Sequence, residues 1–194
     1  MVKQGCAMIV NIFLAFLVTS CANPLNQATS ERYGEACVEA ERNNRLRVAE
    51  QACYRALVNV DWGRLGDFQK SQRMYNLARI KRKLNKFDEA EKLYKDSLAI
   101  EEKLPQRSNE NIGRRFAELA ILYEQCGQIQ DGLPYVHRLY PLADVYRGSE
   151  QKTVAAVFYV YSLELKKQEK SDEAQTLANK ALTMGFDPKD LNPR

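Results

Sequence analysis

The chain has 194 residues, a formal net charge of +4, nine glycines and six prolines. This length suffices for one domain with its own hydrophobic core, and the charge is too small to indicate a nucleic-acid-binding protein. No useful strand-like alternation occurs, and most glycines and prolines fall outside the helical patterns, which indicates an all-α fold.

Residues 1–20 have the layout of a secretory signal peptide. Lys3 supplies a positive charge, residues 12–17 form an apolar run, and small residues follow. The run is too short for a membrane-spanning helix, which needs about 20 apolar residues. We therefore expect residues 1–20 to be removed during export.

Residues 18–21 read Val-Thr-Ser-Cys and resemble the lipobox of bacterial lipoproteins. The resemblance implies that Cys21 is lipidated and becomes the new N-terminus, anchored by acyl chains that each contribute about 0.8 kcal/mol per buried methylene. In that family a non-acidic next residue, here Ala22, favours the outer membrane and a periplasm-facing protein. The alternative is an ordinary signal peptide cleaved beside Ser20 or Ala22. We expect residues 21–30 to form the lipidated N-terminus and a short linker.

Four segments between residues 31 and 184 share a pattern of small and large residues. Ala78, Ala120 and Ser162 hold equivalent places at intervals of 42 residues, and Cys37 holds this place in a degenerate first copy. In the second copy, apolar residues recur at three- and four-residue steps on both sides of a turn at Asn85, which predicts a helical hairpin. The sequence thus predicts about four stacked hairpins, and the alternative is a helical bundle without repeats.

The second copy contains Asn-Leu-Ala at residues 76–78 and Glu-Ala at residues 89–90, and it resembles the tetratricopeptide repeat (TPR) in the longer form found in kinesin light chain. The resemblance implies a right-handed superhelix, an α-solenoid whose first helices line a concave binding face. Two departures stand out. Lys81 replaces a tyrosine of the family's first helix, and Gly132 replaces an alanine of its second.

Several residues interrupt the pattern. Trp62, between the first two copies, is expected to cover the core between repeats rather than to contact a ligand. Pro141 lacks an N–H group, so it should kink or break the second helix of copy three. His137 is expected at the surface or against Tyr140. Residues 185–194 are expected to form a C-terminal tail after a helix stop at Gly185.

Three cysteines remain after the signal peptide and Cys21 are set aside. Cys37 and Cys53 flank the turn of the first copy at similar distances, so antiparallel helices would bring them level. They either form a disulfide in an oxidising periplasm or serve as small buried residues. Cys126 is left without a predicted disulfide partner.

No phosphate-binding loop, serine elbow or histidine-bearing metal motif occurs, so we expect no enzyme, no cofactor and no metal. The concave face should instead bind a peptide or protein, with aromatic and aliphatic side chains giving contact area and arginines pairing with carboxylates. Asn76 matches a family asparagine that holds a peptide backbone. The residues expected to face the partner are Tyr75, Asn76, Arg79, Arg82, Arg114, Ile121, Tyr159, Leu163 and Lys166.

Three functions follow from this reading. The first is a noncatalytic, outer-membrane-tethered adaptor for a protein or peptide partner of a cell-envelope assembly. The second is a periplasmic holdase or transport factor for unfolded or lipidated clients, which would need a broad apolar groove. The third is an enzyme with Cys126 or Cys37 as its nucleophile, which would need a thiol of low pKa.

Overall fold

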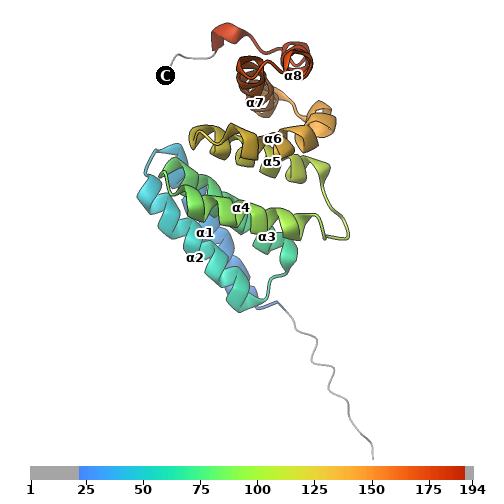
Figure 1. Ribbon diagram of the computed structural model, residues 1–194. Helices are drawn as coiled ribbons and strands as arrows, with labels where there is room; N and C mark the ends of the chain where they lie inside the picture. The colour runs from blue at the N-terminus through green and yellow to red at the C-terminus, as the bar shows by residue number, and fades with distance from the viewer. Residues whose placement is uncertain (1–21, 191–194) are drawn as a thin grey trace, which may run out of the picture.

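The computed structural model describes residues 22–190 and, within them, eight α-helices, two short 3-10 helices and no β-strand. The α-helices pack as four consecutive antiparallel hairpins (Figure 1), so the predicted all-α repeat fold is confirmed. The expected signal peptide and Cys21 lie outside the described residues. The helices are α1 Pro24–Arg42, α2 Leu46–Gly63, α3 Asp67–Lys83, α4 Phe87–Glu101, α5 Asn109–Gln125, α6 Ile129–Leu139, α7 Gly148–Lys167 and α8 Ser171–Thr183.

The turn inside each hairpin has the same backbone geometry. Asn44, Asn85, Gly127 and Glu169 have φ values of 53°, 57°, 71° and 62°, and they follow one another at 41, 42 and 42 residues. In every turn the N–H of the next residue donates to the carbonyl five residues earlier, the hydrogen bond that ends helices at a left-handed residue. The backbone therefore repeats with the period read from the sequence.

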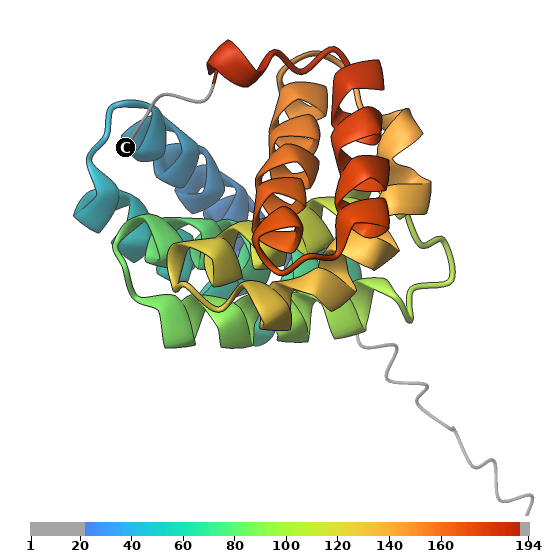
Figure 2. The ribbon, with the colours of Figure 1, turned by 45° about the horizontal axis from the view of Figure 1, so that its top comes forward.

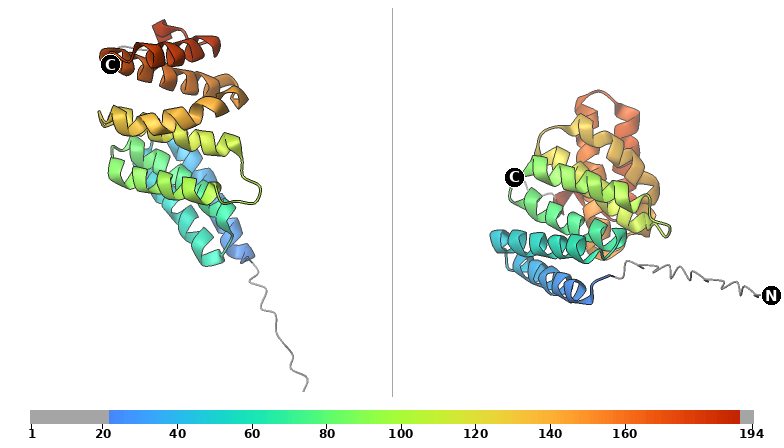
Figure 3. Two further views of the ribbon diagram at one scale, coloured as in Figure 1. Left: turned by 45° about the vertical axis from the view of Figure 1, so that its right-hand side comes forward. Right: turned by 90° about the horizontal axis from the view of Figure 1, so that it is seen from below.

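The hairpins stack in chain order, and the last pair is turned relative to the others. Figure 3 shows the four pairs layered from α1 and α2 to α7 and α8. In Figure 2, α7 and α8 cross α5 and α6 at a steep angle. None of the described helices is both long and apolar enough to cross a membrane.

The predicted break at Pro141 is confirmed. Helix α6 ends at Leu139, and the 3-10 segment η1, Tyr140–Val145, takes over. His137 lies at the surface, where its ring pairs with Glu173, whereas the Tyr140 ring packs against Phe158. The first of the two alternatives for His137 is therefore the correct one.

The expected linker over residues 21–30 is wrong for residues 24–30, because α1 begins at Pro24. Asn23 caps the helix, its side-chain oxygen accepting from the Leu25 N–H at 3.0 Å. The Asn23 N–H donates to the Gly63 carbonyl at 3.0 Å, which ties the start of α1 to the end of α2. The repeat domain therefore begins almost immediately after Cys21.

The expectation that Trp62 covers the core is also wrong. Its side chain is 75% exposed, whereas Val60 and Gly63 are buried. Each helical residue is rotated about 100° from the previous one, so Trp62 points roughly 160° away from Val60. Small and β-branched residues fill the inner face of α2, and the indole is left in solvent.

A separate core cluster lies between the first hairpin and α3. Ala40, Ala49 and Ala52 pack there around a disulfide between Cys37 and Cys53, whose Cα atoms are 5.2 Å apart. At the other end of the chain, Phe186 folds back and its ring lies 4.9 Å from that of Tyr159. A single larger core runs between these ends through the remaining helices.

Candidate functional site

A groove of about 350 Å³ lies on the face formed by α3, α5 and α7. Tyr75 from α3, Ala117 and Ile121 from α5 and Val154 from α7 supply its apolar part. Ala117 and Ile121 are four residues apart, so they lie along one side of α5. The charged groups that line the same groove are Arg79, Arg82, Lys83, Arg114, Glu118 and Glu150.

The charged side chains of α3 are held by carboxylates from the helices on either side. Glu41, near the end of α1, accepts from Arg79 at 2.6 Å and from Lys83 at 2.7 Å. Glu118 of α5 pairs with Arg82 at 2.9 Å. Burial raises the pKa of Glu41, but the hydrogen bond from Lys83 and the charge of Arg79 outweigh it and lower the pKa below its usual value. Glu41 is therefore ionised at neutral pH.

A further ion pair joins α5 to α7. Arg114 donates to Glu150 at 2.9 Å, and it also pairs with Glu110 one turn back on its own helix. The side chains of Arg114 and Glu150 keep 32% and 45% of their surface exposed. Such exposed pairs contribute only about 0–1 kcal/mol to stability, so a partner can exchange them for its own charges at small cost.

Tyr75 forms the aromatic centre of the groove. The guanidinium of Arg79 lies 5.8 Å from its ring centroid and that of Arg115 lies 5.1 Å away. Burial and the charge of Glu118 raise the pKa of its hydroxyl, which keeps the phenol neutral. Neighbouring cations thus hold the ring in place beside the apolar part of the groove.

Arg115 belongs to a buried polar network beneath the groove. It pairs with Glu101 at 3.2 Å, and both side chains are 1% exposed. Its Nε donates to Ser97 and its Nη2 to Ser71, each at 2.7 Å, and its Nη1 donates to the backbone carbonyl of Asn111. Because α3, α4 and α5 all contribute, the network fixes the second hairpin against the third.

A second hollow, of about 520 Å³, lies over α1. Three glutamates from successive turns, Glu31, Glu35 and Glu39, line it together with Arg42 and with Arg73 from α3. Its balance is acidic, in contrast to the excess of cations in the α3–α5–α7 groove.

Five of the nine residues expected to contact a partner line the groove together, namely Tyr75, Arg79, Arg82, Arg114 and Ile121. Asn76, one residue after Tyr75, does not line it.

The three residues expected on α7 are not brought into the groove. Tyr159 packs against Phe186, and neither Leu163 nor Lys166 lines the hollow. Val154 is the α7 residue that does line the groove. Tyr159 comes five residues later and is rotated about 140° around the helix from Val154, so it lies on a different side of α7.

The sequence reasoning missed the carboxylates that pair with the groove cations. The pairs Arg82–Glu118 and Arg114–Glu150 each span 36 residues, six fewer than the repeat. Lys180 and Asp144 show the same interval. A search for opposite charges at this constant separation would have found them.

Neither cysteine proposed as a nucleophile has an activated thiol. Cys37 is consumed in the disulfide. Burial, together with the nearby charges of Asp88 and Glu91, raises the pKa of the Cys126 thiol, which reduces its thiolate fraction at neutral pH. Among residues 22–190, no three histidine, cysteine, aspartate or glutamate side chains gather where they could hold a metal ion.

The repeated hairpins define a TPR-like repeat protein, and solved structures share this fold. BtubC (BKLC) from P. vanneervenii matches with a TM-score of 0.71 and 18% identity, over 87% of this chain and 68% of that chain. A Podosopora anserina protein described as a kinesin light chain with nearly identical TPR-like repeats matches with a TM-score of 0.60 and 17% identity, over 84% of this chain and 77% of that chain. No family model and no curated protein matches the chain.

Proposed function

We propose that this protein is a noncatalytic interaction module that binds a peptide or protein partner of a cell-envelope assembly in its α3–α5–α7 groove. The observation that carries the proposal is the combination of an apolar, aromatic groove with partly exposed ion pairs along it. Apolar side chains of an extended segment would contact Tyr75, Ile121 and Val154. Its charged groups would exchange with the exposed pairs.

The acidic hollow over α1 would determine the orientation in which an extended segment binds. A partner segment with basic residues at one end would place them near Glu35 and Glu39. Its acidic residues would then lie near Arg79 and Arg114. Charge complementarity of this kind selects the orientation of a bound segment more than it adds affinity.

The groove favours this function over a holdase for unfolded or lipidated clients. Such a holdase needs a broad apolar surface, whereas charged side chains line much of this groove. Capture of many unrelated clients in place of one partner would favour the holdase.

A substitution that fills the groove with a larger side chain, but keeps its ion pairs and apolar residues, tests the proposal. Thr153 lines the groove, is exposed, and bonds only to the Ser149 carbonyl four residues back. Thr176 on α8 makes the same local bond to Asp172 and does not line the groove. Thr153→Phe should abolish capture of one stoichiometric partner from solubilised envelopes, and Thr176→Phe should retain it. Equal capture by both variants contradicts the groove assignment.

A charge reversal sharpens the same experiment. Arg79→Glu combined with Arg82→Glu should also abolish capture, since both cations line the groove. Circular dichroism must first show that this variant keeps its helices, because both arginines pair with carboxylates of neighbouring helices.

The proposal includes a lipid tether at Cys21, in the outer membrane and facing the periplasm. The support is the lipobox-like sequence of residues 18–21 and the non-acidic Ala22. Mass spectrometry of the mature N-terminal peptide should find acyl chains on Cys21, and Cys21→Ala should release the protein from outer-membrane fractions. An unmodified N-terminus at another residue contradicts the tether and leaves the groove assignment standing.

A further inference from the structure

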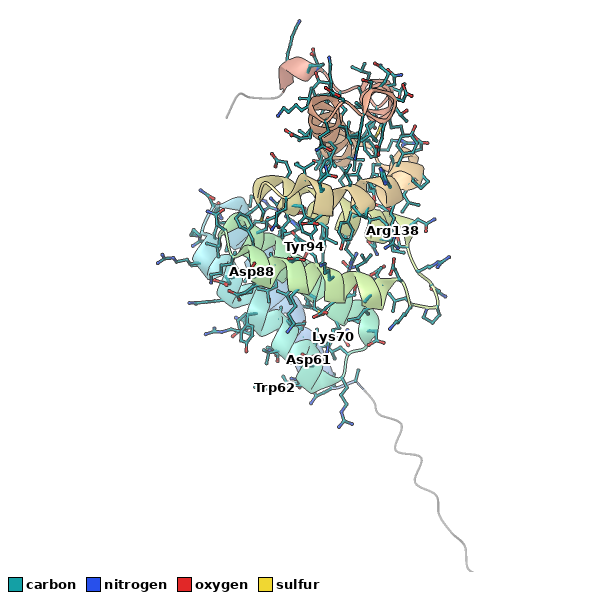
Figure 4. All side chains as sticks on the ribbon, viewed as in Figure 1. Asp61, Trp62, Lys70, Asp88, Tyr94 and Arg138 are labelled. Carbon is teal, nitrogen blue, oxygen red and sulfur yellow. A yellow bond between two sulfur atoms is a disulfide. The ribbon has the colours of Figure 1, made fainter. Side chains whose placement is uncertain are left out.

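Three large apolar side chains are exposed at one end of the first hairpin. Trp62, in the last turn of α2, is 75% exposed, and Leu25, in the first turn of α1, is 74% exposed. Phe68, in the first turn of α3, is 53% exposed. The end of α2 and the starts of α1 and α3 lie at the same end of the antiparallel helices, and Figure 4 shows Trp62 there.

The start of the described chain is fixed at this same end. The Asn23 N–H donates to the carbonyl of Gly63, the residue next to Trp62. A β-carbon built on Gly63 would lie 2.6 Å from the Asn26 side chain, so the first turn of α1 packs directly on the last turn of α2. Two residues of extended chain span at most about 7 Å, so Cys21 cannot lie farther than that from Asn23.

We propose that this end of the first hairpin, with Trp62 at its centre, docks onto the surface of the lipid bilayer that holds the acyl chains of Cys21. The inference rests on the lipid tether proposed above and adds a contact between the folded domain and the lipid. Because α1 begins three residues after Cys21, no linker separates the domain from the membrane. The end of the hairpin must then lie within a few ångströms of the headgroups.

The chemistry of this end suits a headgroup layer. An indole combines an apolar body with one N–H donor, and tryptophan is enriched where membranes meet water. The ionic groups beside it are already partly neutralised, since Lys70 pairs with Asp61 at 2.8 Å. Arg64 is exposed next to Gly63 and can meet a lipid phosphate. Insertion of the indole therefore buries apolar surface beside a carboxylate that is already paired, while exposed Asp67 stays in the hydrated headgroup layer.

The single tryptophan of the chain makes the contact measurable without a label. The full protein, purified from a host that lipidates exported proteins, is reconstituted into vesicles of phosphatidylethanolamine and phosphatidylglycerol. Matched vesicles carry bromine on the upper part of the acyl chains, which quenches nearby indoles. Trp62 should lose roughly half of its emission there and shift to shorter wavelength, because an interfacial side chain sits about 5–10 Å into the boundary layer.

A matched variant moves the indole along the same helix. Trp62→Phe combined with Tyr54→Trp places it at another exposed position of α2, eight residues and about 12 Å away. The relocated indole should keep its emission in brominated vesicles. Since Trp62 and Tyr54 are both largely exposed, neither change should disturb the fold, which circular dichroism will check.

Each outcome decides between the tether and the docking surface. If the protein floats with the vesicles and only the native tryptophan is quenched, the docking surface is supported. If it floats and neither indole is quenched, the tether stands and the docking proposal is overturned. Equal quenching of both indoles also overturns it, because the helix would then lie flat on the lipid. A protein that neither floats nor carries acyl chains overturns both proposals.

Discussion

The first hairpin and the last two fill their interiors with different side chains. Between α1 and α2 the buried residues are mostly alanines and the disulfide of Cys37 and Cys53. Between α5 and α8 they include Phe116, Phe158 and Tyr161. Burying one large apolar side chain contributes about 1.5–3 kcal/mol, far more than an alanine methyl does. The comparison indicates that a covalent bond compensates for a small core in the first hairpin.

The junction between α3, α4 and α5 differs from both of these regions, since a buried ion pair lies at its centre. Arg115→Ala should destabilise the protein by about 3–5 kcal/mol, because Glu101 would remain buried without its cation. Urea unfolding followed by circular dichroism measures the loss.

A double variant provides the control for that prediction. Arg115→Leu combined with Glu101→Met should recover most of the loss, because no charge is then left buried. A loss below about 1 kcal/mol for Arg115→Ala would show that water reaches Glu101 and that the junction is not dry.

Removing the disulfide should have the next largest effect. Cys37→Ala combined with Cys53→Ala should cost about 3 kcal/mol by the loop-entropy estimate for a loop of this size. Hydrogen exchange should become faster in α1 and α2 and stay unchanged in α7 and α8, since each hairpin contacts mainly its neighbours. Equal acceleration in all helices would contradict the view that the bond compensates for a local deficit.

Substitution of Gly132 tests how closely the helices pack in the aromatic region. A β-carbon there would lie 1.8 Å from the Tyr161 hydroxyl, which donates to the Ala120 carbonyl at 2.8 Å. Gly132→Ala should therefore cost about 1–3 kcal/mol in thermal or urea unfolding. Adding Tyr161→Phe should recover part of this cost. If Gly132→Ala leaves the unfolding free energy unchanged, the alanine of the TPR pattern fits at this position after all.

The smallest expected effect concerns acid stability. Hydrogen bonds from Lys95 and Tyr123 lower the pKa of Glu91 below its ordinary value of 4.5. A carboxyl with a lower pKa in the folded state stabilises the protein above its unfolded pKa, and this contribution is lost as the pH falls through the folded pKa. Glu91→Gln should thus lower the unfolding free energy by less than about 1 kcal/mol at neutral pH, and the difference should vanish in acid. Glu164→Gln on α7 is the surface control.

The hairpin turns could be predicted from the sequence because they depend on local residues. The turn at Asn85 and a turn between Cys37 and Cys53 were expected where they occur, and the break at Pro141 follows from its missing N–H. The first turns of α1 could not be predicted in this way. Its first buried residue is Ser30, so no apolar stripe marks the helix before that point.

The site was less predictable than the fold, because it depends on how helices rotate against each other. The repeat placed Tyr75 and Ile121 on the groove face correctly. The same reasoning placed Tyr159 there, although the tail residue Phe186 packs on its ring. Trp62 was misplaced for a similar reason, since α2 points its small residues inward.

The contact of Phe186 with Tyr159 also bears on how far the array can grow. Repeat hairpins end in a surface shaped to receive another hairpin, and an open end of this kind invites head-to-tail fibres. Here the Phe186 ring covers Tyr159, and the Gln151 side chain holds the preceding turn by donating to the Met184 carbonyl at 2.8 Å. A further hairpin that stacked on Tyr159 would first have to displace Phe186.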